Sequence, residues 1–485
     1  VSVSAGATKD SAYAFTISVN IVLGTTAATI SGATIDGPTR VEVKASDESN
    51  LQAIAGALGL GLDGNGLGGA LGWNQVGITT TAGIIDATLT NVAGTVDVIA
   101  ESTEADSLMD GTILAASIGA AGSSGSSVGG ALSINIVTSA VSTEITRSTV
   151  TAGGLVTVTA TDQSTIRALA GGVAFSYTSA SSASIGAAIA VNIIGETLIL
   201  DIVPGVSATV DTSTIDTDGG LEVLATSEQT IDSLTLGFAA TVSNSGSGSG
   251  TGTGTDTGTS SGTDSGTDTP DTTGYGSGGS FSFTGAGSVS VNSISRPTSA
   301  EVRASTLTLG GPLVVKATDA SDIFADVGAA ALAISIGRGS GGSTTAAVGV
   351  AVAVNSISNS LLASLDDTDV IESSSVEVRA SSATRIEALG LAGSASVGAD
   401  KGTSFSGGLA FAGVVIVNIV DNTVEALVTN SSDVVSEGAV LVEASEAQTA
   451  YTITDDIRDD LTDLSFTEPD DGDTTPADEE ALDLA

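Results

Sequence analysis

The sequence lacks two residue types on which much protein chemistry depends, because its 485 residues include no Cys and no His. Without them the chain cannot form a disulfide, a Ser-His-Asp triad, a thiolate nucleophile or a zinc site with the usual nitrogen and sulfur ligands. It also has only 13 Lys and Arg against 56 Asp and Glu, for a net charge of −43. Nucleic-acid binding needs clustered basic residues, so the charge balance excludes that function class and also opposes adsorption to anionic lipid.

Long hydrophobic runs and aromatic side chains are scarce as well. A membrane-spanning helix needs about 20 apolar residues. The run Leu409–Val420 is much shorter than that, and Ile185–Val203 is interrupted by Glu196 and Asp201, so we expect no membrane insertion. Aromatic residues make up 3% of the chain, whereas hydrophobic residues make up 41% and Gly occurs 62 times. This composition excludes a disordered acidic chain and indicates thin, regularly stacked β-structure.

What the chain does have is an internal repeat. An apolar segment that ends in Asn recurs along the chain, and an alternating segment that ends in Ala follows each copy. The repeated Asn residues are Asn20, Asn74, Asn135, Asn192, Asn292, Asn355 and Asn418. All but one of the steps between them are of similar length, and the long step from Asn192 to Asn292 contains an insertion. About seven copies of a unit of about 60 residues therefore fill positions 1–450.

Period-two alternation predicts that these units are built from strands. In the first copy Val41 and Val43 alternate with Glu42 and Lys44, which is typical of a half-buried strand. Runs such as 51–62 (LQAIAGALGLGL) have helix as the competing interpretation, but Gly and β-branched residues interrupt most copies.

We predict an all-β fold, a parallel β-solenoid (β-helix) in which each strand pairs with its counterpart in the next coil. A narrow interior of this kind suits Ala, Gly, Ser and Val. One repeat accommodates about three coils of about 20 residues or fewer, wider coils, and both remain open at this point. A chain of antiparallel sandwich modules is the alternative, but hairpin-turn dipeptides do not recur at a fixed place in the copies.

Two segments break the repeat. The Gly/Ser/Thr-rich insertion with scattered Asp cannot bury a core, and we expect it to be a surface loop. The C-terminal tail is strongly acidic. The expected domains are repeats one to four at 1–242, the insertion at 243–280, repeats five to seven at 281–450 and the tail at 451–485.

The repeated polar residues are interpreted as structural. An Asn at a fixed position in a solenoid bonds backbone at a turn or forms a ladder with its equivalents, so we assign the seven Asn residues to that role. Lys44, Lys316 and Arg379 each precede the repeat Ala, and Arg167 and Arg385 follow it. Because they keep the repeat register, we expect solvated strand positions and no converging basic site.

Calcium is the ligand that the acidic clusters favour, because it takes clustered carboxylate oxygens. The candidate ligands are Asp216, Asp218, Asp366, Asp367, Asp369, Asp470, Asp471 and Asp473. No cluster fits an EF-hand loop or the tandem G-G-x-G-x-D pattern, so binding would be weak. We expect no other cofactor.

Carboxylates alone can hydrolyse glycosides, but sugar clefts use aromatic platforms, and Trp73 and the four Tyr are dispersed. We therefore expect no catalytic residues and no enzymatic activity.

The unit STVTAGGLVTVTA at Ser148–Ala160, followed by Gly/Ala/Ser-rich strands and a Val-Asn strand, resembles the repeats of very large secreted bacterial surface proteins. These are the filamentous-haemagglutinin-like adhesins and related β-helical biofilm-matrix proteins. The resemblance covers about 1–450 and implies an extracellular, cell-surface structural or adhesive role. It carries no active-site residues, and the acidic tail departs from it.

The repeat runs essentially from residue 1 without a polar cap, so we expect an unpaired strand edge that either continues into more chain or pairs with a neighbouring copy. The assembly mode that this predicts is head-to-tail stacking. The expected function is a subunit or segment of a surface fibre, adhesin or biofilm-matrix filament, a homopolymer assisted by divalent cations. The alternative is an adhesin module on a longer stalk that binds surface glycans through the 243–280 loop. A polysaccharide-active β-helix enzyme is a third, less favoured interpretation.

Overall fold

The computed structural model describes residues 1–103, 112–178, 181–195, 205–245, 280–337, 343–400, 406–430 and 432–450. These residues form strands and turns and contain no helix. Their strands pair in parallel, so the predicted all-β fold with parallel sheets is confirmed. Most of the predicted insertion (246–279) and the predicted tail (451–485) lie outside the described residues.

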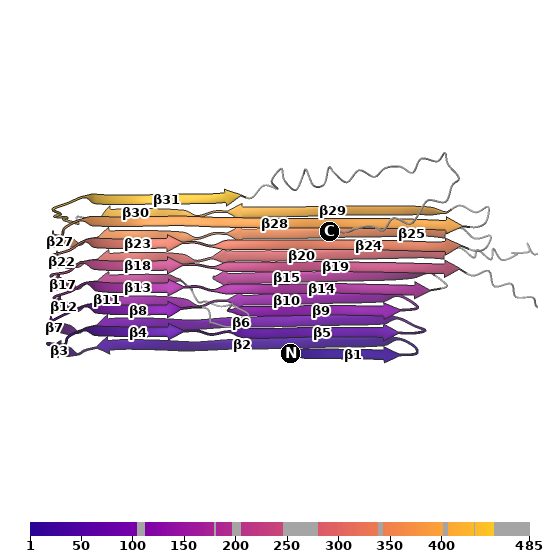
Figure 1. The fold of residues 1–485 in the computed structure, drawn as a ribbon, viewed down its shortest axis with the longest axis horizontal. Helices are drawn as coiled ribbons and strands as arrows, with labels where there is room; N and C mark the ends of the chain where they lie inside the picture. Colours follow the sequence, from indigo (N-terminus) through magenta and orange to yellow (C-terminus); the bar gives the residue numbers. More distant parts are fainter. Residues whose placement is uncertain are drawn as a thin grey trace, which may run out of the picture. The chain divides into compact units, whose positions relative to one another are not determined.

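Residues 1–449 form one compact unit with three sheets (Figure 1). The 12-stranded sheet contains β2 (Ala12–Ser31), β6 (Gly66–Ile85), β10 (Ser127–Val137), β11 (Ala140–Thr146), β15 (Ser182–Gly195), β16 (Val206–Asp211), β20 (Ser280–Ser295), β21 (Pro297–Arg303), β25 (Ser343–Ile357), β26 (Ser360–Asp366), β29 (Gly407–Val420) and β30 (Thr423–Thr429). The six-stranded sheet contains β3 (Thr34–Asp36), β7 (Thr88–Val92), β12 (Thr149–Ala152), β17 (Thr214–Thr217), β22 (Thr306–Leu309) and β27 (Asp369–Glu372).

The 13-stranded sheet returns the chain along the opposite side. It contains β1 (Ser2–Thr8), β4 (Val41–Asp47), β5 (Leu51–Gly61), β8 (Val96–Ser102), β9 (Ile113–Ser123), β13 (Val156–Asp162), β14 (Thr165–Thr178), β18 (Leu221–Ser227), β19 (Thr230–Ser245), β23 (Leu313–Asp319), β24 (Asp322–Gly337), β28 (Val376–Asp400) and β31 (Val440–Ala450). The run at 51–62 thus holds the strand β5 rather than a helix.

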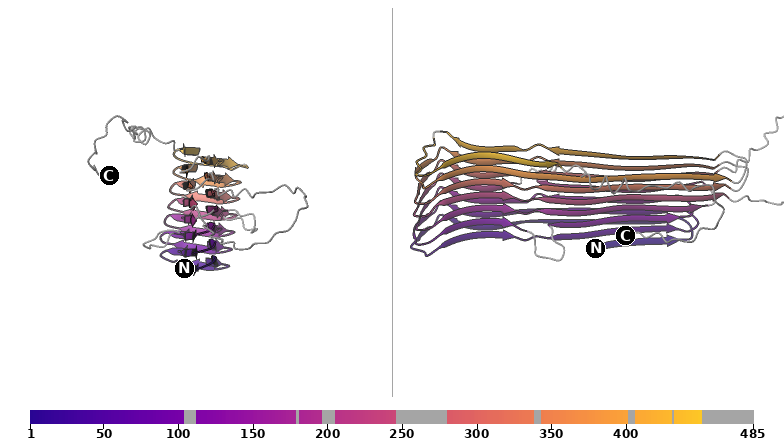
Figure 2. Two further views of the ribbon diagram at one scale, coloured as in Figure 1. Left: turned by 90° about the vertical axis from the view of Figure 1, so that its right-hand side faces the viewer. Right: turned by 45° about the horizontal axis from the view of Figure 1, so that its top comes forward.

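The chain passes through the three sheets in a fixed order. It leaves β2 for β3, runs back through β4 and β5, and enters β6, which pairs with β2. Asn20 faces Asn74 in that register, and the last step of the same kind joins Asn355 to Asn418. Each repeat therefore makes one wide layer, and the layers stack in sequence order (Figure 2).

One half of each layer has apolar side chains inside and polar side chains outside. Between the six-stranded sheet and its neighbours lies a core of Val, Ile, Leu and Ala, to which Val98, Val158 and Val223 belong. Outward positions there carry charged and polar side chains, and Lys44 Nζ lies 2.5 Å from Glu101 Oε1 on the next strand. We call this part the aliphatic-core half.

The other half of each layer has small side chains inside and large apolar side chains outside, and we call it the small-residue half. There β5, β9, β14, β19, β24 and the second part of β28 face β6, β10, β15, β20, β25 and β29. The inward positions are mostly Ala, Gly, Ser and Thr. Large apolar side chains point outward instead, and Ile185 and Ile189 of β15 are each 41% exposed.

Close approach of the two sheets explains why the interior of this half is so small. At many inward glycines an added Cβ would lie within 2.2 Å of a backbone carbonyl oxygen on the facing sheet, which no real structure tolerates. These glycines include Gly59, Gly68, Gly119, Gly129, Gly172, Gly186 and Gly237. With no room for large side chains inside, the apolar residues of these strands occupy the outer faces.

Candidate functional site

The seven repeated Asn residues lie in one column at the inner face of the 12-stranded sheet. From Asn20 to Asn355, each side-chain amide Nδ2 donates to Oδ1 of the next Asn, with six N–O distances between 2.7 and 2.9 Å. Asn74, Asn135, Asn192 and Asn355 are fully buried. The column is therefore a continuous amide ladder along the stacking direction, which holds neighbouring layers in register.

A second polar row runs through the interior where the two halves meet. The carboxylate of Asp319 accepts hydrogen bonds from Ser321 Oγ at 2.6 Å and Asn359 Nδ2 at 3.0 Å, and Ser382 adds a third at 3.3 Å. Burial raises the pKa of Asp319, although these donors act in the opposite direction. The sequence shows only a short polar segment after each repeat Ala, with no signal that it is buried.

This polar row contains one fully buried cation. The Arg296 guanidinium forms an ion pair with Asp162, and both side chains are completely buried. Burial lowers the pKa of Arg296, while Asp162 opposes that shift. Nε and Nη1 of Arg296 have no hydrogen-bond partner among the described residues. This Arg is a member of no repeated column of basic residues, so sequence periodicity could not have located it.

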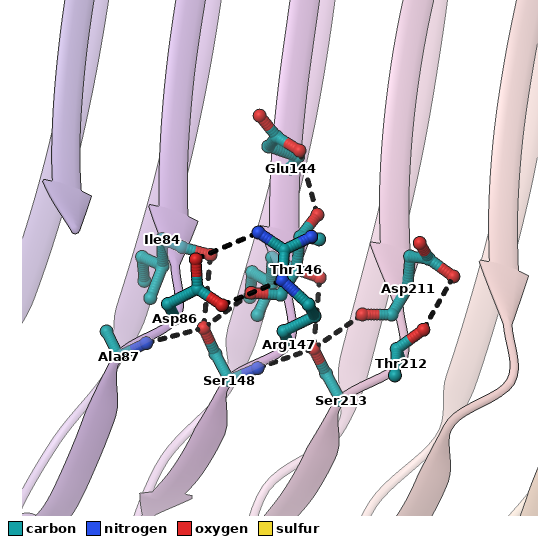
Figure 3. Close-up of polar contacts among 11 residues, drawn as sticks. Ile84, Asp86, Ala87, Glu144, Thr146, Arg147, Ser148, Asp211, Thr212 and Ser213 are labelled. Carbon is teal, nitrogen blue, oxygen red and sulfur yellow. Dashed lines mark hydrogen bonds and ion pairs between the residues drawn. The ribbon is translucent and has the colours of Figure 1, made fainter. Parts of the chain in front are cut away.

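The corner between the 12-stranded and six-stranded sheets has a column of residues with left-handed backbone. Their φ angles lie between 45° and 60°, and the members are Gly32, Asp86, Arg147, Thr212, Ala304, Asp367 and Asn430. Beside them, Ser148 Oγ accepts from the Ala87 N–H and Ser213 Oγ accepts from the Ser148 N–H, both at 3.1 Å (Figure 3). Because chemically unlike residues share this conformation, composition gives no signal for it.

One corner pair is charged. Arg147 donates two hydrogen bonds to Asp86, at 2.7 and 2.9 Å, and so lowers the pKa of the Asp86 carboxyl (Figure 3). Both side chains are about half exposed. An exposed pair of this kind contributes little to stability, so we assign it a role in the register of the corner and not in chemistry.

The predicted calcium ligands are not gathered into one site in the described part of the chain. Asp216 lies on β17, opposite Thr151 and Thr308 of the neighbouring strands, and Asp218 follows in the turn. Asp366 ends β26, and its Oδ1 accepts from Thr429 Oγ1 at 2.9 Å and from Asn430.

Asp367 belongs to the corner column and Asp369 begins β27. Among the described residues, no three acidic side chains come close enough together to hold a metal ion. Asp470, Asp471 and Asp473 lie outside the described residues. Calcium binding stays a prediction.

The outer face of the 12-stranded sheet in the small-residue half is a broad surface without charged side chains among the described residues. It comprises the outward side chains from Tyr13 to Ile21 of β2 and their register equivalents on β6, β10, β15, β20, β25 and β29, and we call it the apolar face. None of its described residues is Asp, Glu, Lys or Arg. Tyr13 and Phe15 are 67% and 64% exposed.

The opposite outer face, on the 13-stranded sheet, is apolar in part but also carries charged side chains, including Arg167, Asp232 and Glu387. Asp326 lies on the same face, and its pKa is raised by burial and by the nearby Asp232. A shallow depression of about 470 Å³ there is rimmed by Leu236, Phe238 and Leu391 and has no ionisable residue in its lining. Alternation of large and small residues was visible in the sequence, but which set pointed outward was not.

The described stack is open at both ends. Within it, β2 and β29 are the first and last long strands of the 12-stranded sheet, and each pairs on one side. At the β29 end Val414 and Ile416 belong to the inward set, next to Gly390 of β28, yet are 40% and 37% exposed. Uncovered parallel edges of this kind are places where another strand can add.

The described part of the chain contains no helix long and apolar enough to cross a lipid bilayer. Comparison of the chain with protein-family models, curated proteins and solved structures found no match.

Proposed function

We propose that the chain is a parallel β-solenoid of about seven wide coils, and that it acts as a non-enzymatic, extracellular structural protein. It is a subunit or segment of a self-associating surface fibre, adhesin or biofilm-matrix filament. The extracellular location follows from the resemblance of its repeat to those of secreted bacterial surface proteins. The non-enzymatic role rests on the sequence, in which Trp73 and the four Tyr are dispersed, whereas sugar clefts use aromatic platforms.

The observation that carries the proposal is the direction of the Asn ladder. Every ladder bond runs from Nδ2 of one Asn to Oδ1 of the next, from Asn20 towards Asn418. Among the described residues, Asn20 Oδ1 accepts no ladder bond and Asn418 Nδ2 donates none. A second copy placed on the β29 end with its β2 would continue the ladder, the parallel pairing and the interior in one step. Head-to-tail stacking therefore satisfies both open ends.

The net negative charge of the chain opposes this assembly. Copies that each carry −43 repel one another, so divalent cations should favour stacking by screening and by binding acidic clusters. Calcium is the cation proposed here, bound weakly at surface carboxylates.

The test is electron microscopy of the purified protein with calcium and with EDTA. We expect filaments in calcium, shorter or fewer filaments in EDTA, and loss of filaments in Ile416→Lys, which places a charge at the open interior of the β29 end. The control Thr159→Lys adds the same charge at an outward position where other layers carry Lys44 and Lys316. Single copies under every condition, or Ile416→Lys filaments of wild-type length, would contradict the proposal.

A further inference from the structure

We infer that the apolar face is a lateral docking surface for the apolar face of a second copy of this chain. This association is separate from head-to-tail stacking, because it uses the broad outer side of the 12-stranded sheet and neither of its edges. Three properties of the face favour this docking: its area, its lack of charge and its relief.

The area is sufficient for a stable interface. Seven strands spaced about 4.8 Å apart, each contributing about nine residues of about 3.3 Å, cover on the order of 1,000 Å². The largest apolar patch on a typical monomer is about 300–600 Å², and a standard interface buries about 800 Å² on each partner. Left in water, this face would be an unusually large apolar surface, whereas docking to its own copy would bury it completely.

Charge also favours a second copy. The net charge of −43 opposes association in general, but no described residue of this face carries a charged side chain. The acidic side chains of the same sheet, such as Glu144 on β11, lie in the aliphatic-core half. Asp232 and Asp326 lie in the small-residue half but on the opposite outer face. At about 0.15 M salt their repulsion is screened beyond about 8 Å, so it weakens the docking without preventing it.

The relief of the face is self-complementary. One column across the strands is made mostly of small residues, with Gly130, Ala187 and Gly287 in its central layers. The next outward column is large throughout, with Leu132, Ile189 and Val289 in the same layers. The column of large residues forms a ridge and the column of small residues forms a groove about 6.6 Å from it. A copy related by a twofold axis can therefore place its ridge in the groove of the first copy, while the ridge of the first copy fills its groove.

A lipid surface is the competing occupant of an uncharged face. Burying the small-residue half in hydrocarbon would place the open edges at β2 and β29 where their backbone groups find no hydrogen-bond partners, which is costly. Docking to a second copy leaves the edges in water, where their backbone groups can form hydrogen bonds. The structure therefore favours protein over lipid at this face.

The test uses the edge-blocked variant Ile416→Lys, so that head-to-tail stacking does not contribute. Sedimentation velocity at protein concentrations up to about 100 µM should show a dimer, because interfaces of this size have dissociation constants that reach into the micromolar range. Adding Ile189→Lys, in the middle of the ridge, should weaken dimerisation by at least about 100-fold, since it buries an unpaired charge. The matched control Leu224→Lys makes the same change on β18, in the outward column of Lys44 and Lys316, and should leave the dimer intact.

Three results would overturn the inference: a monomer at every concentration, a dimer unaffected by Ile189→Lys, or flotation of a monomer with phosphatidylcholine vesicles. If Ile189→Lys fails to fold, Val289→Cys takes its place, because the chain has no other cysteine. A short bis-maleimide should link Val289→Cys copies and leave Thr159→Cys copies unlinked, and the reverse pattern would place the contact elsewhere. Since stacking is blocked throughout, failure here leaves the head-to-tail proposal untouched.

Discussion

Each Asn inside the ladder uses its amide twice, as a donor to one layer and an acceptor from the other. Asn135 accepts from Asn74 and donates to Asn192, both at 2.8 Å, and is fully buried. Asn20 is only partly buried and makes one ladder bond. The same substitution should therefore have very different costs along one column.

We predict that Asn135→Ala lowers the free energy of unfolding by about 2–5 kcal/mol, because it leaves a buried donor and a buried acceptor unsatisfied. Asn20→Ala should cost about 1 kcal/mol. Urea unfolding followed by circular dichroism measures both, and hydrogen exchange should locate the loss in the layers beside Asn135. Equal costs for the two variants would mean that the ladder does not stabilise the stack.

Some of these residue columns could be predicted from the sequence and others could not. The Asn column could be predicted because one residue type recurs at nearly constant spacing, although a turn role and a ladder were both open. The corner column escaped prediction because Asp86, Arg147, Thr212 and Ala304 share a backbone conformation and no side-chain chemistry. Arg296 escaped because it occurs in one layer alone.

At the scale of the strand, the close approach of two sheets sets which residues face inward. In β10, Gly129 points at the facing strand, where an added Cβ would lie 1.8 Å from the Val173 carbonyl oxygen. Its neighbour Gly130 points outward, and the nearest atom to an added Cβ is 3.8 Å away. Two adjacent glycines thus serve different purposes.

We predict opposite effects for alanine at these two positions. Gly129→Ala forces the sheets apart and should cost at least about 3 kcal/mol of unfolding free energy, at the upper end of overpacking. Gly130→Ala should be neutral or stabilise by up to about 1 kcal/mol, because it restricts the unfolded chain without a clash. Thermal unfolding of the pair would decide, and a similar loss in both would refute the close approach of the sheets.

Strand alternation alone could not predict the reversed polarity of the small-residue half. In β15, Ile185 and Ile189 alternate with Gly186 and Ala188, and the usual interpretation puts the isoleucines inside. The structure puts Gly186 inside because its added Cβ would lie 1.9 Å from the Phe238 carbonyl oxygen. The distance between the two sheets is a property of the assembled layers, so it cannot be predicted from the sequence of a single strand.

For the whole molecule, the sequence predicted parallel β-structure and the repeat, and left the width of a coil open. The register settles the width, because Asn135 pairs with Asn192 directly, with no intervening strand of the same sheet. The net charge of −43 and the apolar face coexist because the small-residue half keeps charge off one broad side. The lateral association that we propose depends on this separation.

Head-to-tail stacking determines the axial repeat of the assembled filament. Strands that stack head to tail must lie across the filament, so the layers and the copies should each give a regular spacing along its axis. Electron cryomicroscopy of filaments formed in calcium measures both spacings. We expect a layer spacing of about 4.8 Å and a repeat of about 34 Å for one copy of seven layers. Filaments whose strands run parallel to the axis would contradict it.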